Sequence, residues 1–196
     1  MEEIVYLEPR GAVHLGERGI GLEETSPLLH ADTLYAALGV AWAMLFGERA
    51  LAEEWFRPEP PVLLSSAFPF AGPVRFYPRP YLPARVAAPH FPIKEIAFVS
   101  EGVLRRMLTG RPLEEGVRIH EGTVWMTGEE AEALREAFGR RELAGERFWA
   151  RHRIPRVALD LVTQTSSLWH FGRLVFREAG PRPEARAGLF LSLIHI

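Results

Sequence analysis

Apolar side chains recur at steps of three and four between residues 31 and 46, the spacing that forms one stripe along an α-helix. The members of this stripe are Ala31, Leu34, Tyr35, Leu38, Ala41, Trp42 and Leu45. Gly47 follows directly, and glycine commonly ends a helix. The pattern therefore predicts a helix over residues 31–46.

Two shorter helices are predicted further along the chain. The segment Thr127-Gly-Glu-Glu130 has the spacing of a capping box, in which a hydroxyl caps the helix and a glutamate follows three residues later. It predicts a helix that ends near Phe138. Residues 101–108, with Gly110 after them, form the other candidate.

Runs rich in β-branched and aromatic residues predict the strands. These runs cover residues 3–7, 62–70, 75–81, 93–100, 118–119, 123–126, 155–164 and 167–177, and a last short strand starts near Gly188. We expect hairpins over residues 118–126 and 155–177. The prolines of the 75–81 stretch place it at a sheet edge or in a loop, because proline cannot donate to a ladder.

The order of these elements indicates an α+β fold with antiparallel sheets and packed helices. A ferredoxin-like (RRM-like) βαββαβ unit fits this order. The chain stops on the apolar run from Phe190 to Ile196 without a terminal turn. A central strand could end a chain in this way. We favour a sequence that is cut short, with a tail over Leu191–Ile196 that resembles translated adaptor sequence.

Composition narrows the class of protein. An apolar fraction of 47% against 24% charged residues is typical of globular proteins. No apolar run reaches the roughly 18 residues that span a bilayer, and the acidic start Met1-Glu2-Glu3 does not resemble a signal peptide. These features predict a soluble, cytoplasmic protein with no membrane partner.

Charge is distributed unevenly along the chain. Residues 1–60 hold 11 acidic and 4 basic side chains, whereas residues 61–196 hold 14 acidic and 19 basic ones. The positive charge gathers from Arg75 to Arg111 and from Arg140 to Arg156. Such stretches favour a polyanion such as nucleic acid, because each neutralised phosphate releases counterions. An ordinary solvated surface would have the same composition.

No pattern of catalytic or metal-ligating residues emerges. The chain has no cysteine and no paired histidines at ligand spacing, and its glycines at 16, 19 and 21 match no phosphate-binding motif. We therefore expect no metal, no cofactor and no catalytic activity. A metal-independent ribonuclease is the alternative, since it needs only a histidine as general base. By residue type the candidates are His14, His90, His152 and His170.

Arginines alternate with rings in two neighbouring segments, residues 147–156 and 167–173. Arginine pairs with phosphate, and tryptophan, phenylalanine and histidine stack on bases. The opposing interpretation is that Phe148, Trp169 and Phe171 are core residues. The combination of rings and positive charge predicts RNA binding.

Five segments, taken in order, resemble one family. They are His14–Glu17 with Leu29–Leu38, Ser65–Phe70, Tyr77–Pro80, Ile93–Ser100 and Val157–Thr163. In these segments the chain is similar to the type III-A CRISPR RAMP proteins, and within them to the fourth small subunit of the Csm effector complex. Leu161 stands where this family carries arginine, and Arg79 where it carries lysine.

The resemblance implies a ferredoxin-like RAMP domain with insertions over residues 1–140. It implies the truncated start of a second ferredoxin-like half over residues 141–196. It further implies that Leu34 and Leu38 anchor the first helix to the sheet.

The function implied by the resemblance is non-catalytic. Such a subunit holds the 5′ handle of the crRNA and docks a large polymerase-palm subunit and a backbone RAMP subunit. The residues expected to contact RNA are Arg79, Lys94, Arg153, Arg156, Thr163, Gln164, His14 and Gly16. Two alternatives stay open: a repeat-processing endoribonuclease with a histidine base, and a protein scaffold whose arginines meet acidic partners.

Overall fold

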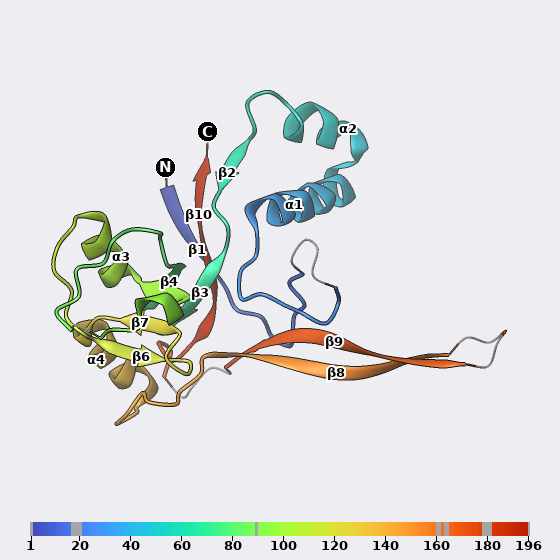
Figure 1. The fold of residues 1–196 in the computed structure, drawn as a ribbon. Helices are drawn as coiled ribbons and strands as arrows, with labels where there is room; N and C mark the ends of the chain where they lie inside the picture. Colours follow the sequence, from blue (N-terminus) through green and yellow to red (C-terminus); the bar gives the residue numbers. More distant parts are fainter. Residues whose placement is uncertain are drawn as a thin grey trace.

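The computed structural model describes residues 2–16, 21–88, 90–159, 162, 165–177 and 182–195. Within them the main sheet has the strand order β1-β10-β3-β4-β5-β7-β6, and a short strand, β2, also pairs with β10 (Figure 1). These strands are β1 (Glu2–Leu7), β2 (Val62–Leu64), β3 (Phe68–Ala71), β4 (Val74–Pro78), β5 (Phe98–Ser100), β6 (Val117–Ile119), β7 (Val124–Met126) and β10 (Ala187–His195). The β5–β7 pair is parallel and the other pairs are antiparallel. The predicted α+β class is confirmed.

The last strand, β10, joins the two ends of the chain in one sheet. It pairs with β1 along its length, from Leu189 opposite Leu7 to Ile194 opposite Glu2. Its first half also pairs with β3, so it fills the position between those two strands. The strand expected near Gly188 is therefore present, and the sheet does not separate residues 1–140 from residues 141–196.

Two predicted strands are shorter than expected. Residues 62–70 divide into β2 and β3, and between these strands Ala67 pairs with Leu29. Ser65 Oγ accepts from Ser192 N at 2.9 Å and Ser66 Oγ from Ala31 N at 3.1 Å. Residues 93–100 begin with a single 3₁₀ turn, η2 (Ile93–Glu95), and only β5 is extended.

The prediction that prolines exclude residues 75–81 from the sheet interior is wrong. Strand β4 lies between β3 and β5, with Phe76 opposite Ser100. Pro78 is its last residue and Pro80 lies beyond it, so neither removes a donor from the middle of the ladder.

Side chains pack on both faces of the sheet. Along β7, Val124 and Met126 belong to the larger core cluster, whereas Trp125 between them belongs to a second one. Helix α3 (Glu101–Leu108) contributes to the second cluster, and helix α4 (Gly128–Phe138) contributes to the first. Both helices were predicted, and Thr127 and Glu130 form the expected capping box.

Helix α1 (Ala31–Phe46) has the predicted bounds but packs little against the sheet. Leu34 contacts the main core, as expected, whereas Leu38 is 38% exposed, so its anchoring role is wrong. The helix instead packs on the segment formed by α2 (Glu48–Ala50) and the π-helical turn η1 (Leu51–Trp55). Tyr35 donates to the Trp55 carbonyl oxygen at 3.1 Å, and the Trp55 ring lies against Gly39.

Strands β8 (Trp149–Leu159) and β9 (Ser166–Phe176) form a separate two-stranded ribbon that extends away from the rest of the molecule (Figure 1). Eleven residues a strand give it a length of roughly 36 Å. The predicted hairpin is confirmed, and β8 begins six residues earlier than expected. Among the described residues, none of the helices has the length and apolar character needed to cross a bilayer.

Candidate nucleic-acid interface

One face of the β8–β9 ribbon carries rings and positive charge together. In the antiparallel register His152 is opposite Arg173, Ile154 opposite Phe171 and Arg156 opposite Trp169. Directly opposed residues lie on the same face, so these side chains form one row, which we call the ring face. Trp169 and Phe171 make an edge contact with ring centroids 6.3 Å apart. Part of the predicted alternation of rings and guanidinium groups, Arg156 and Arg173 with Trp169 and Phe171, therefore lies on a single surface, whereas Arg151 and Arg153 lie on the opposite face.

The opposite face of the ribbon is covered near its middle by the chain around Glu24. A Cβ atom on Gly172 would lie 2.3 Å from the carbonyl oxygen of Glu23, so only glycine permits this approach. The guanidinium group of Arg153 forms an ion pair with the Glu24 carboxylate. Arg153 and Arg156 are thus on the same strand, but they lie on opposite faces of it.

His14 supports the ribbon from the side. Its Nδ1 lies 2.7 Å from the carbonyl oxygen of Gly172, and its ring lies 4.7 Å from that of Phe171. Gly16 is exposed and close to the His14 side chain. The structure therefore brings His14, Gly16, Arg153 and Arg156 together at the ribbon.

Arg79 and Lys94 lie on a different part of the molecule, beside β5. Arg79 donates through Nε to the Ile96 carbonyl oxygen at 3.0 Å, and its guanidinium group lies over the Tyr81 ring. Lys94 is exposed on η2. Thr163 and Gln164 lie outside the described residues, so the predictions for them stay untested.

A pocket of about 380 Å³ lies where the ribbon leaves the main sheet. We call it the root pocket; its principal side chains are Phe98, His120, Glu121, Arg147, Trp149 and Arg151. The root pocket lies between the Arg79 region and the ribbon. On one side its wall includes Ala97, whose carbonyl oxygen accepts a hydrogen bond from the Arg79 backbone N–H. On the other side it includes Arg151, which lies two positions before Arg153 on β8.

His120 is the buried polar residue of the root pocket. Its Nε2 accepts a hydrogen bond from the Phe148 backbone N–H at 3.0 Å, and its ring lies 3.9 Å from that of Trp149. Burial, with a smaller contribution from the positive charge of Arg147, lowers the pKa of His120 to about 4. The imidazole is therefore neutral at physiological pH. Sequence reasoning did not select His120, because its burial depends on a strand 28 residues away.

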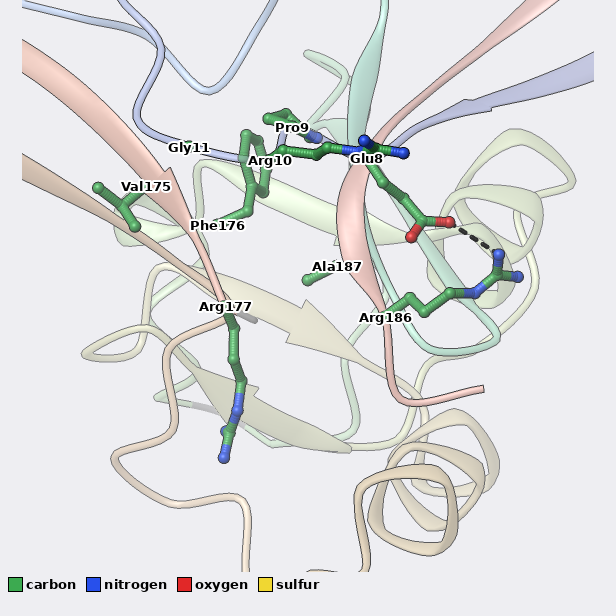
Figure 2. Close-up of a pocket in the computed structure, with 9 residues that line it drawn as sticks. All are labelled: Glu8, Pro9, Arg10, Gly11, Val175, Phe176, Arg177, Arg186 and Ala187. Atoms are coloured by element: carbon green, nitrogen blue, oxygen red, sulfur yellow. Dashed lines mark hydrogen bonds and ion pairs between the residues drawn. The ribbon is translucent and has the colours of Figure 1, made fainter. Parts of the chain in front are cut away.

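A second hollow of about 590 Å³ lies on the other side of the ribbon root (Figure 2). Three arginines line it, but they do not converge: Arg186 pairs with Glu8 at 2.7 Å, whereas Arg177 points away and pairs with Glu146. Arg10 reaches across the upper wall in this view. This hollow therefore adds arginines to the surface near the start of the ribbon, but their side chains do not converge on one binding site.

The described part of the chain offers little to a metal ion. Within it, no three histidine, aspartate or glutamate side chains lie close enough together to hold one. The arrangement consists instead of arginines, rings and one neutral imidazole, which are groups suited to bind phosphates and bases.

Comparisons with known proteins identify the fold. No protein-family model matches the chain, and no curated protein matches it. Among solved structures, a Csm3–Csm4 subcomplex of the type III-A CRISPR-Cas interference complex matches with a TM-score of 0.65 and 15% identity, over 98% of this chain and 57% of that one. Csm1–Csm4 cassettes in complex with AMPPNP and with cA4 match with TM-scores of 0.55 and 0.54, both at 18% identity and over 100% of this chain. The chain spans 61% and 58% of those two chains. It has the fold of these type III RAMP subunits, which confirms the predicted fold.

Proposed function

We propose that this chain is an RNA-binding subunit of a type III-A CRISPR interference complex in the cytoplasm. In this proposal it holds the 5′ handle of the crRNA and docks a large polymerase-like subunit and a backbone RAMP subunit. The fold shared with Csm3–Csm4 and Csm1–Csm4 structures supports a place in such an assembly. The sequence segments that resemble the same family support it independently.

The observation that carries RNA binding is the ring face of the ribbon. It presents His152, Arg156 and Arg173 beside Trp169 and Phe171 on an element that stands clear of the main sheet. A single-stranded RNA laid along it can pair its phosphates with guanidinium groups and stack its bases on rings. The acidic first third of the chain would repel phosphate and would face protein or solvent.

Replacing two ribbon arginines tests this proposal. For the double variant Arg156→Ala, Arg173→Ala, which removes both arginines of the ring face, we expect the affinity for a synthetic 5′-handle RNA to fall about tenfold or more. The dependence of log Kd on log salt should decrease by about 1 to 2, because two phosphate contacts are lost. Fluorescence anisotropy over a salt series measures both quantities.

The matched control removes the same charge elsewhere. Arg49→Ala, Arg57→Ala changes two exposed arginines of the α2–η1 region, far from the ribbon in Figure 1. This variant should bind RNA as the parent does. Equal losses in both doubles, or a Kd that ignores salt, would favour the protein-scaffold alternative.

We further propose that the subunit performs no chemistry on RNA. His14 is engaged with the Gly172 carbonyl group, and His120 holds a backbone hydrogen bond in a buried, neutral state. Incubation with repeat RNA in EDTA tests this point, and we expect no cleavage. Site-specific cleavage that disappears in His152→Ala or His170→Ala would establish the ribonuclease alternative instead.

A further inference from the structure

The root pocket combines an apolar floor with a charged rim. Phe98 and Trp149 line it with their rings, 6.0 Å apart in an edge arrangement, and neutral His120 stacks on Trp149. The imidazole is uncharged and its Nε2 already accepts a hydrogen bond, so His120 offers a flat, uncharged ring surface to a ligand, as Phe98 and Trp149 do. A volume of about 380 Å³ is at the small end of the range for ligand sites.

Two guanidinium groups, those of Arg147 and Arg151, stand at the rim of the pocket. Arg147 is half-exposed and forms an ion pair with Glu121, which is itself exposed. Among the described residues Arg151 forms no ion pair, and it is exposed. One rim arginine is therefore open to an anion, and the other is occupied by an internal carboxylate.

The turn that carries Glu121 is strained. His120 and Glu121 have φ angles of 52° and 58°, in the left-handed region that residues other than glycine adopt uncommonly. Such conformations are concentrated at functional sites. Here it places the His120 ring in the pocket wall and the Glu121 carboxylate against Arg147.

We propose that the root pocket binds one unstacked nucleotide of the RNA, with its base against the Phe98, Trp149 and His120 rings and its phosphate on Arg147 and Arg151. The phosphate displaces Glu121 from Arg147, so Glu121 acts as an internal competitor that weakens binding. This inference rests on the proposed RNA-binding function and adds a specific position to it. A nucleotide bound in the root pocket would also connect RNA on the ribbon with the Arg79 region, because the pocket lies between them.

Removal of the competing carboxylate gives the sharpest test, because it predicts a gain. Glu121→Gln should tighten binding of a 12-nucleotide single-stranded RNA about threefold to tenfold, since Arg147 no longer has to release a carboxylate. Glu132→Gln is the control: it removes the same charge from an exposed glutamate that also pairs with an arginine, on α4. It should change the affinity less than twofold.

Photocrosslinking locates the nucleotide. One 4-thiouridine is placed at successive positions of the same RNA, and the crosslinked peptides are identified by mass spectrometry. We expect one position to crosslink to the peptide that contains Phe98 or to the one that contains Trp149, and this crosslink should weaken in Phe98→Ala.

The outcomes separate the two proposals. If RNA binds but all crosslinks map to residues 152–173, or if both glutamate variants tighten binding equally, the pocket assignment is overturned and the RNA-binding function stands. If the parent chain binds no RNA, both proposals fail together.

Discussion

His120 shows how one side chain ties the stability of the protein to pH. Its pKa is lowered to about 4 in the folded state, whereas an unfolded histidine takes up a proton near 6.5. The unfolded state therefore binds more protons between these two pH values. The free energy of unfolding is fully retained above about pH 6.5 and falls as the pH decreases toward 4, by about 3 kcal/mol from this residue.

The variant His120→Asn isolates this contribution, because asparagine tolerates the left-handed backbone at residue 120. We expect the variant to be less stable at pH 7 by about 1–2 kcal/mol, since the Phe148 N–H loses its acceptor. The difference from the parent protein should shrink as the pH falls and should reverse by pH 4, because the parent loses about 3 kcal/mol through His120 and the variant does not. Urea unfolding at pH 7, 5.5 and 4 measures it, and a difference that stays constant with pH would contradict the assignment.

The sequence indicated which residue types the ribbon carries, arginines and aromatic rings, but it did not indicate which other residues they contact. Arg153 was expected to face RNA, but it pairs with Glu24, which is 129 positions away. The pairing depends on the close approach at Gly172, and no local pattern reports such a contact. By contrast, the alternation of arginines and rings is local, so the ring face could be predicted from the sequence.

At the scale of elements, Glu130 links two helix starts. Its carboxylate accepts from the Thr127 backbone N–H at 3.1 Å and from the Gly102 N–H, at the first turn of α3, at 2.7 Å. It also bonds the Ser100 hydroxyl, and that hydroxyl caps α3. One side chain therefore completes the capping of both α4 and α3.

Substitutions at these caps should have graded effects. Thr127→Ala removes one cap and should lower the free energy of unfolding by about 1 kcal/mol. Glu130→Ala leaves several donors without an acceptor and should lower it by about 2–4 kcal/mol. Glu129→Ala, an exposed neighbour on the same turn, should stay within about 0.5 kcal/mol. Chemical denaturation ranks the three, and equal losses for Glu129 and Glu130 would refute the double cap.

Helices were predicted with correct bounds because their signals are local. The capping box at Thr127 and the period of residues 31–46 are complete within the segments themselves. Strand limits were less accurate, because hydrogen bonds to distant residues decide them. Between β2 and β3, Ala67 pairs with Leu29, and Ser65 bonds Ser192.

At the scale of the whole molecule, α1 presents an apolar surface to solvent. Val40, Met44, Leu45 and Phe46 are 59–82% exposed, and Phe56 after η1 is 68% exposed. Val40 and Met44 are four positions apart and therefore share one side of the helix, and exposed apolar side chains of this kind favour association in solution.

The double variant Val40→Glu, Met44→Glu should therefore reduce self-association of the isolated chain without lowering its free energy of unfolding, since both side chains are already in water. Sedimentation velocity at two concentrations measures the first quantity and urea unfolding the second. Leu108→Glu, a single exposed leucine on α3, is the control and should leave association unchanged. Unchanged association in the double variant would show that the helix surface is not responsible.

The position of β10 has a consequence for biosynthesis. Residues 187–195 fill the slot between β1 and β3, so β1 must wait for a strand that lies far along the chain. Pairings of such long sequence separation form slowly. During translation β1 is therefore an open edge until residues 187–195 have been made, and a chaperone or a partner that shields this edge on the ribosome would raise the yield of folded protein.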